Sequence, residues 1–316
     1  MAIAALFSGQ GSQSVGMLAE LANSFPIVTE TFQQASDSLG YDLWHLVQEG
    51  PDSELNKTTI TQPAMLAAGV AVWRVWLQQG GIEPKAGAGH SLGEYSALVA
   101  ANCLDFVHAV HLVTERARLM QSAVPAGAGA MAAVLGAEDA QIIQVCADIS
   151  AQGEIVEAVN FNSPGQVVIA GQTAAVDKAL AALVELGAKK SVKLPVSVPS
   201  HCSLMQEASF ILAKELSQTL LNAPEFTVLH NVDAQPRTSS AGVRAALAEQ
   251  LYKPVRWTQT IEALRDQYNT TLLLEFGPGR TLTSLNRRID RKLNALAIYD
   301  NASLEAALKA VSEGTV

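Results

Sequence analysis

Short apolar segments alternate with longer stretches in which apolar residues recur every three or four positions along most of this 316-residue chain. Continuous aliphatic runs bounded by glycine, proline or polar residues predict strands. Such runs occupy residues 2–7, 85–89, 227–231 and 271–276. Helical spacing fills most of the sequence between them. This alternation predicts an α/β fold with a mostly parallel sheet.

The helical stretches are separated by clear breaks. One stretch, 61–79, is apolar on all sides and should be buried, with Pro63 tolerated in its first turn. Another, 17–50, is interrupted at Gly40 and at Gly50-Pro51. The remaining helices are expected at 91–101, 105–122, 202–220, 240–251 and 258–268, with one more beginning near Arg280.

Residues 124–198 have a pattern of their own, which predicts an insert in a core formed by 1–123 and 199–316. Two expected strands of this insert are joined by Asn162-Ser163-Pro164-Gly165, a strong turn signal. The expected elements are strand 130–135, helix 138–152, strands 155–161 and 166–170, helix 174–186 and strand 191–198. This β-α-β-β-α-β order is that of the ferredoxin-like fold.

Composition narrows the classes of function. Hydrophobic residues make up 49% of the chain and charged residues 16%, which is enough apolar material for a large interior. A net charge of −9 gives nucleic-acid binding no electrostatic basis. No apolar run reaches membrane-spanning length, since Arg74 interrupts the apolar stretch 64–77. The apolar start has no cationic leader, so we expect a first buried strand in a cytoplasmic protein.

The cysteines point to the same compartment. Cys103, Cys146 and Cys202 are too few and too scattered for a disulfide framework or a zinc site. Their odd number is typical of a reducing environment. Neither a metal nor a cofactor is expected.

The segment Gly89-His90-Ser91-Leu92-Gly93 has the G-x-S-x-G spacing of a nucleophile elbow, between an expected strand and an expected helix. A serine in such a turn projects its hydroxyl group, and glycines two residues away leave room for the turn. Backbone N–H groups at the helix start stabilise negative charge there. A glycine-rich turn with an incidental serine is the alternative, but the strand-turn-helix setting favours Ser91 as a nucleophile.

A serine nucleophile needs a base, and the chain has six histidines. His108 and His111 fall in an expected helix and are typical of surface or packing residues. His90 adjoins Ser91, but its side chain should leave the turn in another direction. His201 lies at a strand-to-helix junction, where loops place catalytic groups. We therefore expect His201 to be the base.

The group that would orient this histidine stays open. Asp233 and Glu275 are candidates, although neither has a spacing that decides the matter. A backbone carbonyl could hold the imidazole tautomer instead. Cys202, which follows His201, is more typical of a small buried side chain than of a second nucleophile.

Six segments together resemble the malonyl-CoA:acyl carrier protein transacylases of bacterial fatty-acid synthesis. They appear in the order of that family and span nearly the whole chain. The segments are Phe7-Ser8-Gly9-Gln10-Gly11-Ser12-Gln13, Gly89 to Ser96 (GHSLGEYS), Asn160 to Gln166 (NFNSPGQ), Val198-Pro199-Ser200-His201, Gln250-Leu251-Tyr252 and Glu275-Phe276-Gly277-Pro278-Gly279. The resemblance implies a hydrolase-like α/β core with a mostly parallel sheet and a small inserted ferredoxin-like subdomain.

The resemblance also implies roles in a reaction that moves malonyl from malonyl-CoA to acyl carrier protein. Ser91 would be the nucleophile and His201 the base, with the backbone carbonyl of Gln250 behind the base. The backbone N–H groups of Gln10 and Leu92 would form the oxyanion hole.

Three further residues would bind substrate in this family. Arg116 would place its guanidinium on the free malonyl carboxylate, and Asn160 and Asn162 would also contact substrate. From the residues alone, Arg116 is equally typical of a solvated helix charge. Arg118, two positions on, faces another side of the helix and cannot replace it.

Two departures and a docking surface complete the comparison. Ser8 stands where many relatives have proline. Ser200 stands where some related synthase domains have phenylalanine, so the exclusion of methylmalonyl stays open. An acidic enzyme needs a local basic surface to bind an acidic carrier protein. The basic candidates are Lys189, Lys190 and Lys193 in the insert, and Arg287, Arg288, Arg291 and Lys292 near the C-terminus.

Two other functions compete with acyl transfer. A hydrolase of the same fold class would share Ser91 and His201, but a general esterase gains nothing from a cation such as Arg116 in its pocket. A non-catalytic module of a larger synthase is opposed by the intact Ser91 and His201 pair. Rapid malonate release without an acceptor thiol would favour the hydrolase.

Overall fold

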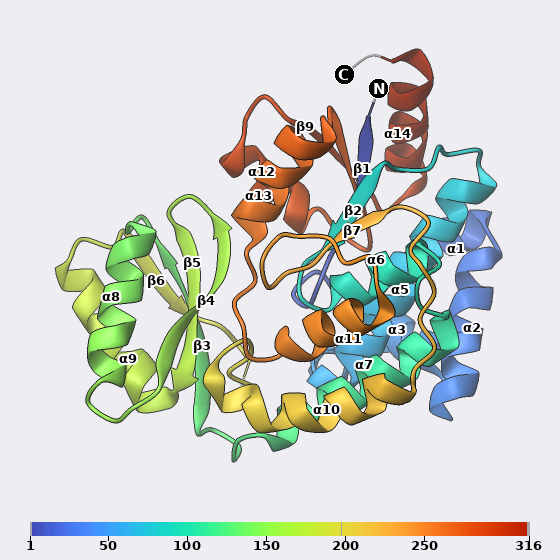
Figure 1. Ribbon diagram of the computed structural model, residues 1–316. Coiled ribbons are helices and arrows are strands. Elements are labelled where there is room, and N and C mark those ends of the chain that lie inside the picture. Colours follow the sequence, from blue (N-terminus) through green and yellow to red (C-terminus); the bar gives the residue numbers. More distant parts are fainter. Residues whose placement is uncertain (1, 197, 315–316) are drawn as a thin grey trace.

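A computed structural model describes residues 2–196 and 198–314 of the chain. Its larger sheet is parallel and has the strand order β7-β2-β1-β8-β9. In the centre, β1 (Ile3–Phe7) pairs with β2 (Ala86–Gly89) on one side and with β8 (Leu272–Phe276) on the other. The edges are β7 (Thr227–Leu229) and β9 (Asn294–Ile298). The predicted α/β core with a parallel sheet is therefore confirmed (Figure 1).

Helices cover both faces of this sheet, which explains why β1 is apolar at every position. Ile3, Ala5 and Phe7 belong to one hydrophobic cluster, and Ala4 and Leu6 to another on the opposite face. The helices of the first cluster include α5 (Thr58–Gln78), α6 (Gly93–Ala100) and α7 (Phe106–Ser122), and those of the second include α12 (Trp257–Tyr268) and α13 (Thr281–Ile289).

The other core helices surround these. They are α1 (Ala19–Ser24), α2 (Ile27–Leu39), α3 (Leu43–Glu49), α4 (Asp52–Leu55), the 3₁₀ turn η1 (Ser203–Met205), α10 (Gln206–Gln218), α11 (Ser240–Glu249) and α14 (Asn301–Glu313). Among the described residues, no helix combines the length and the apolarity needed to cross a bilayer.

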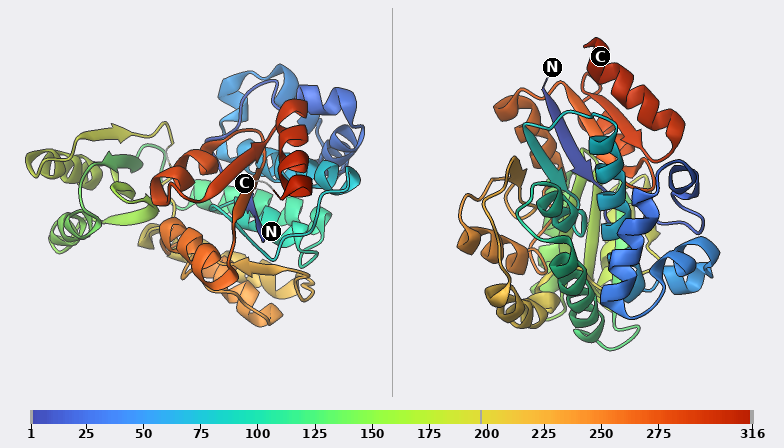
Figure 2. Two further views of the ribbon diagram at one scale, coloured as in Figure 1. Left: turned by 90° about the horizontal axis from the view of Figure 1, so that it is seen from above. Right: turned by 90° about the vertical axis from the view of Figure 1, so that its right-hand side faces the viewer.

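The second sheet is antiparallel and stands beside the core (Figures 1 and 2). Its elements are β3 (Gly129–Leu135), α8 (Asp139–Ser150), β4 (Val156–Ser163), β5 (Gln166–Gln172), α9 (Thr173–Glu185) and β6 (Lys190–Lys193). The strand order β4-β5-β3-β6 is the ferredoxin-like order, as the sequence predicts. The limits of the insert at 124 and 198 stay a prediction.

One face of this small sheet carries α8 and α9, and the other face turns toward the core. Met131, Val159 and Val168 on that second face pack with Cys202, which follows His201 in the chain. The small sheet therefore forms one wall around the loop that holds His201.

The structure departs from the sequence predictions in three places. The last strand of the insert ends at Lys193 rather than at 198, and residue 197 lies outside the described residues. Helix α5 begins at Thr58, so Pro63 lies beyond its first turn. The strand β9 and the helix α14 were not expected, because the alanine-rich β9 has no long aliphatic run.

Candidate active site

The nucleophile elbow lies at the carboxyl end of the central strands. Ser91 follows β2, precedes α6 and has φ of 52°, a left-handed conformation that strains a residue with a side chain. A Cβ on Gly89 would lie 1.8 Å from the carbonyl carbon of Gly93. A Cβ on Gly93 would lie 2.0 Å from the carbonyl oxygen of Phe7. Both glycines are therefore required by close backbone packing around the serine.

Ser91, His201 and Gln250 form a continuous chain of hydrogen bonds. The Nδ1 atom of His201 lies 2.7 Å from the backbone carbonyl oxygen of Gln250, which can only accept a hydrogen bond. The hydrogen is therefore on Nδ1. The Nε2 atom is left to accept from the hydroxyl group of Ser91, at 2.7 Å. This is the arrangement of a serine activated by a neutral imidazole base.

No carboxylate contacts the imidazole among the described residues. Asp233 instead pairs with Arg237. Glu275 accepts hydrogen bonds from the hydroxyl group of Ser8 and from two backbone N–H groups at the start of α13. The sequence left open whether Asp233, Glu275 or a backbone carbonyl orients His201. In the structure, the group next to its imidazole is the backbone carbonyl of Gln250.

The surroundings of His201 favour its neutral form. Its side chain is 2% exposed, and burial, together with the positive charge of Arg116, lowers the pKa of the imidazole to about 3. The hydrogen bond to Gln250 opposes this shift. The imidazole is thus unprotonated and able to accept a proton at neutral pH.

Arg116 is fully buried and directed at the nucleophile, so it is not a solvated helix charge. One guanidinium nitrogen, Nη2, lies 3.2 Å from the Ser91 hydroxyl oxygen and 2.9 Å from the Gln250 side-chain oxygen. The other, Nη1, donates to Gln62 at 2.8 Å. Burial lowers the pKa of Arg116, and the nearby Tyr95 and Glu94 oppose this shift. Arg118 is exposed and pairs with Glu115 on the surface.

A pocket of about 120 Å³ opens onto Ser91 and His201. Gln10 and Asn160 line it, together with Ser200. Asn160 has a buried side-chain oxygen, Oδ1, without a hydrogen-bond partner, which a ligand amide could satisfy. The structure therefore brings these sequence candidates together around the serine.

Two other sequence candidates stand next to this pocket rather than in its lining. The side-chain oxygen of Asn162 accepts a hydrogen bond from Nε2 of His90, at 2.8 Å, and His90 itself lines the pocket. Leu92 is buried at the N-terminal end of α6, directly after Ser91. His108 and His111 lie on the surface of α7, as the sequence indicates.

A buried polar cluster behind the serine escaped the sequence reasoning. Asn231 accepts from the Ser91 backbone N–H at 2.6 Å and donates to the carbonyl oxygen of Gly89 at 2.7 Å. Glu94 accepts from His230 and from Gln250. The available signal was positional: His230 and Asn231 follow strand β7, and parallel strands end at one edge of the sheet.

Comparisons with known proteins agree with this geometry. A model of the acyl transferase domain matches residues 5–285. A malonyl CoA-acyl carrier protein transacylase of Salmonella typhimurium is 55% identical over 96% of this chain and 97% of its own length. The chain belongs to the malonyl CoA-acyl carrier protein transacylase family. A member from Bacillus subtilis is 40% identical over 98% of each chain.

Solved structures of the family share this fold. An acyl carrier protein S-malonyltransferase from Vibrio cholerae is 54% identical, covers 97% of this chain and 99% of its own, and has a TM-score of 0.94. A malonyl-transacylase in complex with a type II PKS acyl-carrier protein is also 54% identical, with a TM-score of 0.96 and coverage of 98% and 99%. The hydrolase-like core and small subdomain implied by the resemblance are confirmed.

Proposed function

We propose that the protein transfers malonyl from malonyl-CoA to the phosphopantetheine thiol of acyl carrier protein, for fatty-acid biosynthesis. One observation carries the proposal: a buried guanidinium, Arg116, lies within 3.2 Å of a serine hydroxyl group that is already hydrogen-bonded to a neutral imidazole. A serine and histidine pair forms acyl esters, and a buried cation beside it selects an acyl group with a free carboxylate.

The first half-reaction forms a malonyl ester. Ser91 Oγ attacks the thioester carbonyl carbon while His201 Nε2 takes the hydroxyl proton. Negative charge develops on the carbonyl oxygen, and the backbone N–H groups of Gln10 and Leu92 are the proposed donors for it. The carbon–sulfur bond then breaks, and the imidazolium returns its proton to the departing coenzyme A thiolate.

The second half-reaction is the reverse with a different thiol. His201 takes the proton of the carrier thiol, whose sulfur attacks the malonyl ester. The bond to Ser91 Oγ breaks, and the imidazolium protonates that oxygen. Arg116 would hold the malonyl carboxylate throughout, and Asn160 and Asn162 are the proposed contacts to the rest of the substrate. Neither half-reaction needs a metal or a cofactor.

The experiment that tests this function is intact-mass analysis after brief incubation with malonyl-CoA. The wild-type protein should gain the mass of one malonyl group, and Ser91→Ala should gain none. Cys202→Ser is the control, because Cys202 is buried and burial raises the pKa of its thiol to about 12. An adduct that persists in Ser91→Ala would refute the proposal, and rapid malonate release without an acceptor would favour a hydrolase.

We also propose a docking surface for the carrier protein. It is supported by the position of one predicted cation near the C-terminus and one in the insert, which both lie beside the turn between β4 and β5. Arg288 donates to the side chain of Gln166, in the turn region between β4 and β5. Lys189 lies against Gly136, whose backbone N–H donates to Gly165 in the same turn region. Both cations are exposed, so an acidic partner could contact them together.

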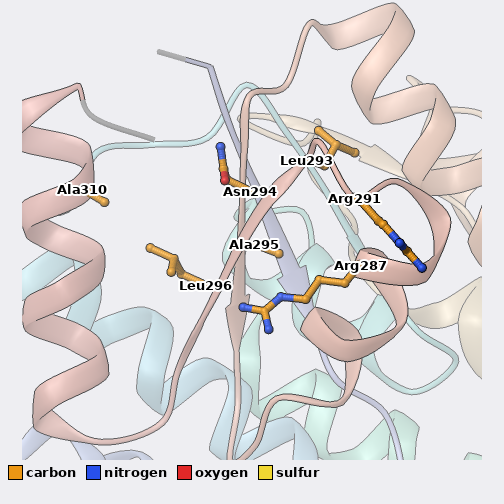
Figure 3. A pocket seen from close by; sticks show the side chains of 7 residues that line it. All are labelled: Arg287, Arg291, Leu293, Asn294, Ala295, Leu296 and Ala310. Atoms are coloured by element: carbon orange, nitrogen blue, oxygen red, sulfur yellow. The ribbon is translucent and has the colours of Figure 1, made fainter.

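Three of the other predicted cations are less suited to this role. Lys193 pairs with Asp177. Arg287 and Arg291 line a separate pocket of about 550 Å³ between α13, β9 and α14 (Figure 3). That pocket includes Leu293 and Asn294, at the start of β9, whereas Ser91 lies at the opposite, carboxyl end of the parallel sheet. We therefore centre the proposed docking surface on Arg288 and Lys189, and leave out Lys193, Arg287 and Arg291.

The reaction is proposed to take place in the cytoplasm. Cys103, Cys146 and Cys202 are all buried as free thiols. Free thiols are retained where the environment is reducing, which is typical of the cytoplasm.

A further inference from the structure

A carboxylate that takes no part in the proposed reaction lies directly behind the site. Glu94 is the third residue after Ser91, in α6, and its side chain is fully buried. Its oxygens accept hydrogen bonds from His230 Nδ1 at 2.7 Å, from the Asn231 backbone N–H at 3.0 Å and from Gln250 Nε2 at 2.8 Å. A buried carboxylate is costly unless its oxygens are satisfied, and here they accept three hydrogen bonds.

The contact with Gln250 leads to both functional ends of the site. The Gln250 side-chain oxygen accepts from Arg116 at 2.9 Å, and its backbone carbonyl oxygen accepts from His201 at 2.7 Å. Its Nε2 also donates to the backbone oxygen of Ser91 at 3.0 Å. Gln250 is thus hydrogen-bonded to Arg116, to the base His201 and to the backbone of the nucleophile Ser91.

Glu94 and the Ser91 backbone oxygen on one side, and Arg116 on the other, fix which way the Gln250 amide points. A carboxylate only accepts hydrogen bonds and a guanidinium only donates them. With Glu94 on one side and Arg116 on the other, the amide is satisfied in one orientation, with its NH₂ toward Glu94. A flipped amide would face an acceptor with its oxygen and a cation with its NH₂ group.

We propose that Glu94 is a positioning residue that holds Gln250 between Arg116 and His201. The inference rests on the proposed function, because it concerns how malonyl is selected over acetyl in that reaction. Glu94 is fully buried and is not among the residues that line the pocket at Ser91. Its effect reaches the reacting atoms through the amide of Gln250, which sets the direction of the Arg116 guanidinium, and through the backbone of the same residue, which holds His201.

The test compares malonyl-CoA with acetyl-CoA as acyl donors to Ser91. Glu94→Gln preserves volume, but one end of the new amide is a donor and the negative charge is gone, so Gln250 is held less firmly. A displacement of about 1 Å at a reacting group lowers the rate by about 100-fold. We expect kcat/KM for malonyl-CoA to fall by about 10- to 100-fold. The value for acetyl-CoA should fall clearly less, because the acetyl reaction does not use Arg116, so the malonyl-to-acetyl ratio of kcat/KM should decrease.

Glu275→Gln is the matched control, because Glu275 is also buried and also accepts three hydrogen bonds, yet it does not contact Gln250. This variant should lose stability and keep the malonyl-to-acetyl ratio of kcat/KM within about twofold of wild type. A double-mutant cycle adds a second check. In the Arg116→Ala background, Glu94→Gln should no longer change the ratio.

Each outcome decides the inference. A ratio that is unchanged in Glu94→Gln overturns it, and so does a ratio that rises, since Glu94 would then be only a counter-charge that opposes malonyl binding. If Glu94→Gln does not fold, Gln250→Met decides, because it keeps the backbone carbonyl for His201 and removes the amide: a lower ratio is expected, and an unchanged ratio overturns the inference. Failure of wild type to become malonylated would contradict the proposed function instead.

Discussion

His201 is oriented by the main chain of Gln250: its Nδ1 lies 2.7 Å from that carbonyl oxygen. A backbone carbonyl fixes the tautomer of the imidazole as a carboxylate would, but it carries no full negative charge. The imidazolium is therefore less stabilised here than beside an aspartate. Burial and the charge of Arg116 act in the same direction and lower the pKa of His201 to about 3.

The first prediction concerns the pH dependence of acylation. Because the charge of Arg116 disfavours the imidazolium, Arg116→Ala should raise the pKa of His201. Since the neutral imidazole is the active form, activity is lost on the acid side, and the acid limb of the variant should move to higher pH. The measurement is single-turnover acetylation of Ser91 across the pH range in both proteins. A limb that stays in place or moves to lower pH contradicts this assignment.

The second prediction concerns the two hydrogen bonds by which Asn231 holds the backbone of the turn around Ser91. Asn231 bonds to the backbone N–H of Ser91 and to the carbonyl oxygen of Gly89, and its side chain is 1% exposed. Asn231→Ala leaves both backbone groups buried without these partners, and each such group costs about 1–3 kcal/mol. We expect the free energy of unfolding in urea to fall by about 2–6 kcal/mol. The control Asn222→Ala, at an exposed position, should lower the free energy of unfolding by about 0.5 kcal/mol or less. Equal losses in the two variants would contradict the stabilising role of Asn231.

The sequence predicted the centre of this site because local chemistry marks it. The elbow around Ser91 needs glycines at fixed positions, and His201 stands in a loop at a strand-to-helix junction. The burial of Arg116 was not predictable in the same way. Thr114–Arg118 holds two arginines, and only the packing of α7 against α5 and the contact with Gln250 decide which one is internal.

The cluster of Glu94, His230 and Asn231 was missed for a related reason. Glu94 lies in a short helix that is buried at every position, and His230 and Asn231 follow a strand of only three residues. Their partners are more than 130 residues apart along the chain, so no local pattern connects them. The parallel order of β2 and β7 brings them together, and that order is a property of the fold.

The third prediction concerns carrier docking. Replacing both Arg288 and Lys189 by glutamate should raise KM for the carrier protein and weaken its dependence on salt, because attraction becomes repulsion. KM for malonyl-CoA in the first half-reaction is the internal reference and should change less. Lys309→Glu is a charge-reversal control on α14, at the other end of the molecule from the small subdomain (Figure 1). An unchanged KM for the carrier in the double variant refutes the proposed surface.

The last prediction concerns the choice of acyl group. In the free protein the Arg116 guanidinium is fully buried and bonded to neutral partners, so a malonyl carboxylate gives it the charged partner that acetyl lacks. Removing one member of a buried charge pair costs about 2–5 kcal/mol, which is about 30-fold to several thousand-fold in kcat/KM for malonyl-CoA. Arg116→Ala should therefore lose most malonyl transfer and lose far less acetyl transfer. Arg116→Lys should have a kcat/KM for malonyl-CoA between those of wild type and Arg116→Ala, since lysine keeps the charge but cannot form two parallel hydrogen bonds to a carboxylate.

The comparison with Arg118→Ala makes this result specific. Arg118 lies on the same helix but is exposed and pairs with Glu115, and surface pairs of this kind contribute about 0–1 kcal/mol. That variant should transfer malonyl and acetyl as wild type does. The measurement is kcat/KM for both thioesters, with circular dichroism as the check on folding. If a folded Arg116→Ala protein loses both reactions equally, Arg116 supports the site without selecting malonyl, because the acetyl reaction retains Ser91 and His201 and has no use for the cation.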